Sequence, residues 1–215
     1  MPVSKYIKDP FPGLSHFFGA GLSIIAMIVL LMASAGKPWW IACFSIYGGC
    51  MITLYLASGT CHSVHCKPAL EKWLDRFDYI AIFLLIAGTY TPVCLIGLGG
   101  VWGWTILIAE WTVAAVGIGL VVSGRGMSNL VRSILYVVMG WLAIVAASPI
   151  LHSLSGPALA WLFAGGVVYS VGAVVFVTNR PNLIPGWFNA HDLWHCMVLA
   201  GSTCHFFLML AMISR

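Results

Sequence analysis

The chain has 215 residues, of which 61% are hydrophobic and only 7% are charged. Soluble domains carry roughly 25% charged residues, so this composition argues against an ordinary water-soluble protein. The formal net charge is +4, but no basic run resembles a nucleic-acid-binding patch. The abundance of Trp, Tyr, Phe and Gly is typical of a protein that crosses a membrane several times.

Apolar stretches of about 20 residues, separated by polar residues or by Gly and Pro, recur along the chain. Each is long enough to cross a bilayer as a helix, so we expect an all-α bundle of seven transmembrane helices. Residues 1–215 then form a single seven-span membrane domain. The expected spans are about 14–33, 39–62, 78–98, 102–122, 131–151, 158–178 and 191–213. A polar connection is expected before the third span, and Pro92 predicts a kink within it.

The basic residues fall mainly on one side of this arrangement. If the N-terminus is cytoplasmic, the outer side holds only Lys37 and Arg215. The cytoplasmic segments then hold the other eight, namely Lys5, Lys8, Lys67, Lys72, Arg76, Arg125, Arg132 and Arg180. The positive-inside rule therefore predicts a cytoplasmic N-terminus and an external C-terminus.

The seven cysteines lie mostly inside apolar stretches, and their number is odd. They are interpreted as small buried hydrophobic residues and not as a disulfide framework. Cys61 and Cys66 flank a histidine-bearing segment. Packing is their expected role, with metal binding as the alternative.

The stretch His191-Asp192-Leu193-Trp194-His195 places two histidines four residues apart at the start of the last expected span. Residues with this spacing lie on one face of a helix, so both imidazoles can reach one metal ion. Imidazole is costly to desolvate in a bilayer unless it is paired or bound to a metal. The alternative is a pair of interfacial histidines that face water.

Two further polar residues fall at the same expected depth. His62 lies at the cytoplasmic end of the second span, and Asp78 lies at the start of the third. Three imidazoles and a carboxylate at one level suit a catalytic zinc site, in which a fourth position stays open for water. Zinc lowers the pKa of such a water towards neutrality. Ser58 lies one turn before His62, so its hydroxyl can point at the same site.

Each of these residues also has an ordinary interpretation. His62 alone fits an interfacial histidine, Asp78 fits the N-cap of a helix, and Ser58 fits a small packing residue between membrane helices. Their convergence at one depth with the same-face pair of histidines favours the metal site.

Five other polar residues are not assigned to the site. Glu110 is expected near mid-membrane, either as an inward-facing structural partner or as part of a polar cavity. His205 lies about 15 Å along the helix from the histidine pair, too far to bind the same ion. His16 shares the level of the site and is expected either to support a ligand or to lie at the interface. His152 and His65 are expected to be solvated.

Taken together, three stretches resemble the bacterial hemolysin III group of the progestin and adiponectin receptor family. They are Ser58-Gly59-Thr60-Cys61-His62, residues 77–92, and residues 191–195 followed by 201–206. The resemblance implies a zinc ion held by three histidines, which match His62, His191 and His195. It also implies that Asp78 holds the water and that Ser58 belongs to the site. Two positions differ from many bacterial relatives, which have a tyrosine at Cys61 and a histidine at Tyr79.

Animal relatives in this family are linked to hydrolysis of the ceramide amide bond, and the wider superfamily includes alkaline ceramidases. The resemblance therefore implies a zinc-dependent hydrolase in the bacterial inner membrane. Its expected substrate is a membrane lipid amide, cleaved near the cytoplasmic face. One alternative is a non-catalytic membrane and lipid homeostasis or sensor protein with a structural zinc. A second alternative is a cytolytic protein of the hemolysin type.

Overall fold

The structure is a computed structural model that describes residues 6–124 and 127–214. Within these residues it contains seven helical spans, which confirms the all-α membrane fold. The uninterrupted spans are α1 (Pro10–Ala33), α2 (Pro38–Ser63), α4 (Gly100–Val122), α7 (Gly156–Thr178) and α8 (Ala190–Ile213). The third span is α3 (Pro68–Pro92) with a π-helical end, η2 (Val93–Leu98). The fifth is α5 (Asn129–Gly140), the 3-10 segment η3 (Leu142–Ala146) and α6 (Ala147–Ser153).

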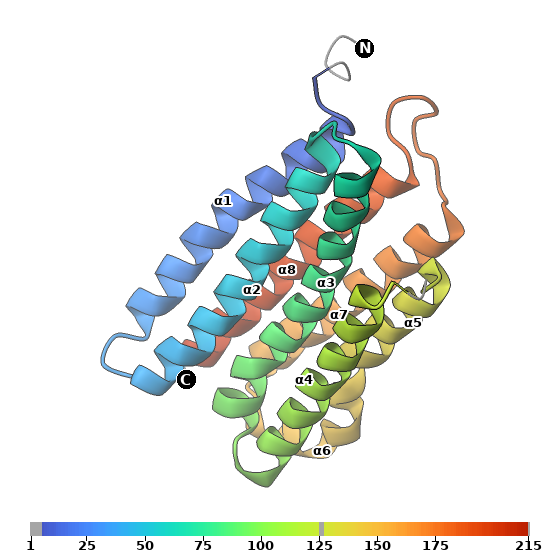
Figure 1. Cartoon of the computed structure of the whole chain (residues 1–215). Helices are drawn as coiled ribbons and strands as arrows, with labels where there is room; N and C mark the ends of the chain where they lie inside the picture. The colour runs from blue at the N-terminus through green and yellow to red at the C-terminus, as the bar shows by residue number, and fades with distance from the viewer. Residues whose placement is uncertain (1–5, 125–126, 215) are drawn as a thin grey trace.

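The helices run up and down through one bundle, and the start of α1 and the end of α8 lie at opposite ends of it (Figure 1). Helix α1 packs against α2 and α8, α3 lies between α2 and α4, and α7 packs against α8. A first span that begins at one end of the bundle and a last span that finishes at the other agree with an odd number of spans. Which end faces the cytoplasm stays a prediction. Of the ten basic residues counted for it, Lys5, Arg125 and Arg215 lie outside the described residues.

Helix α3 begins ten residues before the expected start of the third span. The stretch predicted as a polar connection forms the first turns of this helix, with Lys67 at the N-cap and Pro68 in the first turn. Asp78 is therefore inside the helix, so its alternative interpretation as an N-cap was wrong. Hydropathy marks where a chain enters hydrocarbon, whereas a helix can continue beyond that boundary. For the same reason α1 begins at Pro10, before the expected apolar start.

The fifth span was expected to be one helix, but the structure breaks it after Gly140. The hydroxyl of Tyr90 lies 2.9 Å from the carbonyl oxygen of Met139 and 3.0 Å from that of Gly140. The hydroxyl oxygen of Tyr90 also accepts a hydrogen bond from the backbone N–H of Ala143 at 3.0 Å. A break within a bilayer leaves backbone groups without helical partners, and Tyr90 supplies the missing contacts. The kink predicted at Pro92 corresponds to the change from α3 to the π-helical η2.

Close contact between α1 and its neighbours depends on Gly19. A Cβ atom at this position would lie 2.7 Å from the side chain of Leu199 and 2.8 Å from the ring of Tyr55. Glycine therefore lets α1 pack tightly between α2 and α8, as small residues do in other membrane bundles. Gly21, two residues later, is exposed and has no neighbour within 4 Å of its Cβ position.

We predict that Gly19→Leu destabilises the bundle by about 1–3 kcal/mol, because the larger side chain overpacks the contact with α2 and α8. The measurement is the thermal unfolding midpoint of the purified protein in detergent. Gly21→Leu is the matched control and should leave the midpoint unchanged. Equal midpoints for the two variants would show that α1 is not packed as described.

Candidate metal centre

Three histidines from two helices converge at one end of the bundle. His62 comes from the last turn of α2, and His191 and His195 come from the first two turns of α8. One ring nitrogen from each lies within 4.8 Å of those from the other two. The Nε2 atoms of His191 and His195 are 3.1 Å apart. Two nitrogens bound to one tetrahedral zinc would be separated by roughly 3.3–3.4 Å, so the arrangement fits this ion.

The start of α8 is fixed by a capping box. The side-chain oxygen of Asn189 accepts hydrogen bonds from the backbone N–H groups of His191 at 2.7 Å and Asp192 at 3.2 Å. In return, the Asp192 carboxylate accepts from the backbone N–H of Asn189 at 2.8 Å. This reciprocal pairing sets where the first turn begins. It therefore sets the direction in which His191 and His195 project.

His62 is oriented by Asp9, which lies just before α1. The Asp9 carboxylate is 3.0 Å from Nδ1 of His62, and its backbone N–H donates to the His62 carbonyl at 2.7 Å. With the proton on Nδ1, the Nε2 lone pair is free to bind a metal. No local pattern in the sequence assigns Asp9 to the site, because its partner lies 53 residues away.

His16 supports a different ligand candidate. Its Nε2 lies 2.9 Å from Nδ1 of His195, and its side chain is only 2% exposed. Its burial argues against the expected interfacial position, and its contact with His195 agrees with the other expectation, while the role of His195 as a ligand stays a prediction. The contact leaves Nε2 of His195 directed at His191. Because His195 is also buried, the alternative of two water-facing histidines does not hold.

Asp78 and Ser58 belong to a second group of polar residues beside His62. Asp78, His62 and Cys61 form a second group with potential ligand atoms within 4.8 Å of one another. The Ser58 hydroxyl is within hydrogen-bonding reach of the Asp78 carboxylate. Cys61 was expected to be a packing residue, but the structure places its thiol among potential ligands. That thiol donates a hydrogen bond to Asp75 at 3.2 Å.

An ion pair holds the segment before α1 beside the site. The Nζ atom of Lys8 lies 2.6 Å from Oε1 of Glu71, and its backbone N–H donates to the Ser63 carbonyl at 3.3 Å. The hydrogen bond to the Glu71 carboxylate raises the pKa of Lys8 above its usual value. Lys8 therefore stays charged and helps to keep the neighbouring Asp9 in place.

The histidine cluster opens into a cavity of about 530 Å³. The candidate residues Ser58, Asp78 and the three histidines line one end of it. Apolar and aromatic side chains from α3, α5 and α7 form most of the remaining wall. Leu159 and Phe176, both in the wall, are seventeen residues apart on α7, which is about 25 Å along a helix. The cavity therefore follows much of the bilayer thickness.

The polar residues that were not assigned to the predicted site differ in burial and in position. His205 lines the cavity but belongs to a deeper turn of α8 than the histidine pair. Glu110 is fully buried on α4, and neither of its carboxyl oxygens has a hydrogen-bond partner among the described residues. His152 and His65 are exposed, as expected. Glu110 is therefore inward-facing, but it is not among the residues that line the cavity.

These features define the class of protein. Seven helices are long and apolar enough to cross a membrane, and a cluster of potential metal ligands faces an internal cavity. The chain is thus a polytopic membrane protein with a candidate metal centre at one end of its bundle.

Comparison with known proteins gives the family. The model of the haemolysin-III related family matches residues 4–206, and the chain belongs to that family. It is 40% identical to Hemolysin-3 of Bacillus cereus over 97% of this chain and 93% of the relative. It is also 40% identical to the Hemolysin-3 homolog of Bacillus subtilis (strain 168) over 92% and 90% of the two chains. Heptahelical transmembrane protein 5 of Arabidopsis thaliana is 30% identical over 76% of this chain and 48% of its own length.

We predict that the purified protein binds about one zinc ion per chain, because three imidazoles can share one tetrahedral ion. His191→Ala should lower the zinc content well below this ratio. His152→Ala, which removes an exposed histidine outside the cluster, should leave it unchanged. The measurement is elemental analysis after dialysis in trace zinc.

X-ray absorption of the zinc-loaded protein identifies the ligand atoms. Nitrogen and oxygen neighbours at about 2.0–2.1 Å would support the three-histidine group, whereas a sulfur neighbour at about 2.3 Å would assign Cys61 to the site. Zinc binding that is equal in both histidine variants would contradict a metal centre here.

We further predict that Asp9→Asn weakens zinc binding about 10- to 100-fold, because the carboxylate fixes the ring of His62 and increases its basicity. The dissociation constant is measured by competition with a chromogenic chelator. Ser123→Ala removes an exposed polar side chain at the end of α4, whose hydroxyl donates to the Leu120 carbonyl of the same helix, and it serves as the control. An unchanged affinity in Asp9→Asn would remove Asp9 from the site.

Proposed function

We propose that the protein is a zinc-dependent membrane hydrolase that cleaves the amide bond of a ceramide-like lipid. The observation that carries this proposal is the position of the histidine group, at the polar end of a long apolar cavity. A lipid amide likewise has a polar part and an apolar part, because its amide bond lies at the end of an acyl chain. The family resemblance supports the same reaction class.

His62, His191 and His195 are the proposed zinc ligands. Their nitrogens lie close enough to share one ion, and Asp9 and His16 each contact one of the three rings. Zinc held there would supply Lewis acidity to a water molecule and to the amide carbonyl. The donor set of three imidazoles suits this role because it leaves one coordination position open.

Asp78 and Ser58 are the proposed catalytic residues. Asp78 takes a proton from the attacking water and returns it to the nitrogen that leaves. Water thereby adds across the C–N bond, giving a fatty acid and an amine. The Ser58 hydroxyl donates a hydrogen bond to the oxygen on which negative charge develops. The closeness of Asp78 to His62, and of Ser58 to Asp78, supports these assignments.

The apolar part of the cavity is the proposed site for the acyl chain. Its volume of about 530 Å³ lies within the range of roughly 300–1,000 Å³ that is usual for small-molecule pockets. Aromatic side chains such as Tyr136 and Phe176 line it and offer large apolar contact areas. With the predicted orientation in a bacterial inner membrane, the amide would lie near the cytoplasmic leaflet.

A second candidate is a non-catalytic membrane or lipid homeostasis protein with a structural zinc. The specific observation in its favour is the group of Cys61, His62 and Asp78, which overlaps the histidine group at His62. A fourth protein ligand would close the metal site and leave no position for water. A sulfur neighbour in the absorption experiment, without hydrolysis of any lipid amide, would favour this candidate.

We predict that Asp78→Asn lowers the hydrolysis of ceramide at least about 100-fold, because general base catalysis contributes about 10²–10⁴-fold. Ser58→Ala should lower it about 10²- to 10³-fold, as removal of an oxyanion donor does. The measurement is fatty-acid release from ceramides of several chain lengths by purified zinc-loaded protein in lipid nanodiscs.

Zinc content is determined for every variant, so that loss of chemistry is separated from loss of metal. Thr53→Ala and Ser123→Ala serve as controls, because neither side chain lines the cavity. Hydrolysis that persists in both Asp78→Asn and His191→Ala would refute the proposed enzyme.

A further inference from the structure

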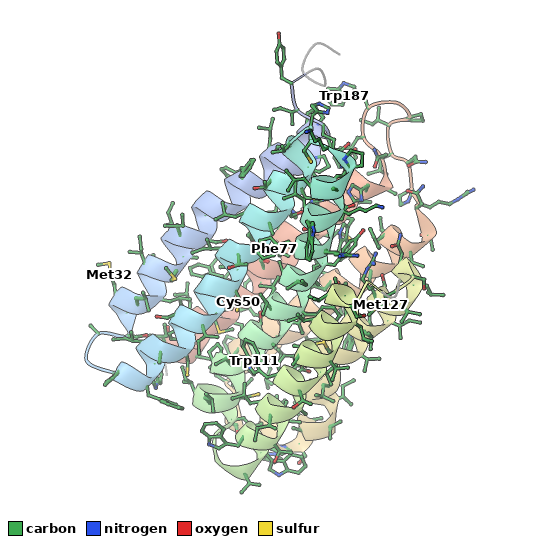
Figure 2. The ribbon with its side chains drawn as sticks, in the orientation of Figure 1. Met32, Cys50, Phe77, Trp111, Met127 and Trp187 are labelled. Atoms are coloured by element: carbon green, nitrogen blue, oxygen red, sulfur yellow. The ribbon has the colours of Figure 1, made fainter. Side chains whose placement is uncertain are left out.

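A second, smaller pocket of about 200 Å³ lies where α3, α4 and α5 meet. Three cationic side chains line it: Lys72 and Arg76 from the first turns of α3, and Arg132 from the start of α5. Met127, labelled in Figure 2 at the turn between α4 and α5, also belongs to its wall. None of these residues belongs to the histidine group.

Arg132 is held in an ordered position. Its guanidinium lies 3.5 Å from the ring centroid of Tyr79, and its side chain is only 8% exposed. One N–H group donates to the Met127 carbonyl at 3.1 Å, and another donates to the side-chain oxygen of Asn129. A guanidinium has five N–H donors in a fixed plane, so further donors remain for a ligand. The stacking fixes the plane in which they point.

The balance of charge in the pocket is positive. The ion pairs found among the described residues do not include Lys72, Arg76 or Arg132. The one carboxylate in the pocket wall is Asp75, and its Oδ1 accepts a hydrogen bond from the Cys61 thiol. Three cations around one carboxylate favour an anionic ligand. Arginine recognises phosphate oxygens especially well, because its planar donors match their geometry.

The surroundings indicate that the anion belongs to a lipid. The pocket is bordered by Leu120, which is 41% exposed, and by Gly124 at the end of α4. Phe77 and Trp73 on the same end of α3 are exposed as well, and the Arg76 guanidinium lies 5.0 Å from the Trp73 ring. Exposed aromatic residues beside cations are typical of the level of lipid headgroups. An acyl chain attached to the bound anion would meet apolar surface immediately.

We propose that Lys72, Arg76 and Arg132 form a binding site for the phosphate of an anionic phospholipid. The pocket shares Asp75, Tyr79 and Arg132 with the wall of the large cavity, so the bound headgroup lies beside that cavity. The site does not depend on zinc or on hydrolysis. It gives the bundle a specific contact with acidic lipids at the end where basic residues are concentrated.

The test measures binding of phosphatidylglycerol and phosphatidylcholine to the purified full chain by native mass spectrometry. The wild type should bind phosphatidylglycerol preferentially. Lys72→Gln combined with Arg76→Gln should weaken that binding about tenfold or more, and Arg76→Gln alone about three- to fivefold. Zinc content and the unfolding midpoint should stay unchanged, which separates this site from the metal centre and from the fold.

The matched control is Lys67→Gln combined with Arg180→Gln. It removes two positive charges from the same predicted side of the bundle, but neither residue lines the pocket. An equal loss of phosphatidylglycerol binding in this control would reduce the effect to general surface charge and overturn the proposal. Displacement of the lipid by millimolar inorganic phosphate or glycerol 3-phosphate would assign the pocket to a soluble phosphate and also overturn it. Resistance to both competitors supports the lipid.

Discussion

Removing imidazole and carboxylate groups from water is costly, and this cost constrains the whole polar end of the bundle. Each ring in the histidine group meets another polar side chain. Asp9 contacts His62, His16 contacts His195, and His191 contacts His195. These contacts join the segment before α1, α1 itself, α2 and α8. The geometry of the potential ligands is therefore determined by four parts of the chain, and no single helix sets it.

The same end of the molecule combines two environments that share a wall. On one side the histidine group faces the large apolar cavity, and on the other the basic pocket lies among α3, α4 and α5. The stacked pair of Arg132 and Tyr79 belongs to both. Tyr136 reinforces this wall, because its hydroxyl donates to the Tyr79 carbonyl at 2.9 Å. A lipid anion and a lipid chain could thus be held side by side at the level of the headgroups.

His62 occupies the central chemical position, because both groups of potential ligands include it. With His191 and His195 it offers three nitrogens, which suits a metal with an open position. Cys61 and Asp78 add a thiol and a carboxylate beside it, and either would close the site as a fourth ligand. Under the proposed function, whether a bound ion would keep a position for water therefore depends on which neighbours of His62 coordinate it.

The sequence by itself determined the features that depend on local physics. Runs of apolar residues predicted seven spans, and the four-residue spacing of His191 and His195 placed them on one helical face. The order of the spans also put His62 and Asp78 at the same end as that pair, where the structure brings them together. Hydropathy did not show that α3 extends into the polar region or that Tyr90 holds a break in the fifth span.

Only the tertiary structure decided the partners of these residues. It paired Asp9 with His62 across 53 positions and His16 with His195 across 179 positions. It also gathered three basic residues from α3 and α5 around one pocket. Such contacts follow from which helices pack together and how each is rotated about its axis. The spacing of apolar residues in one segment determines which face of that helix is apolar. Which helix contacts its polar residues depends on the packing of the whole bundle.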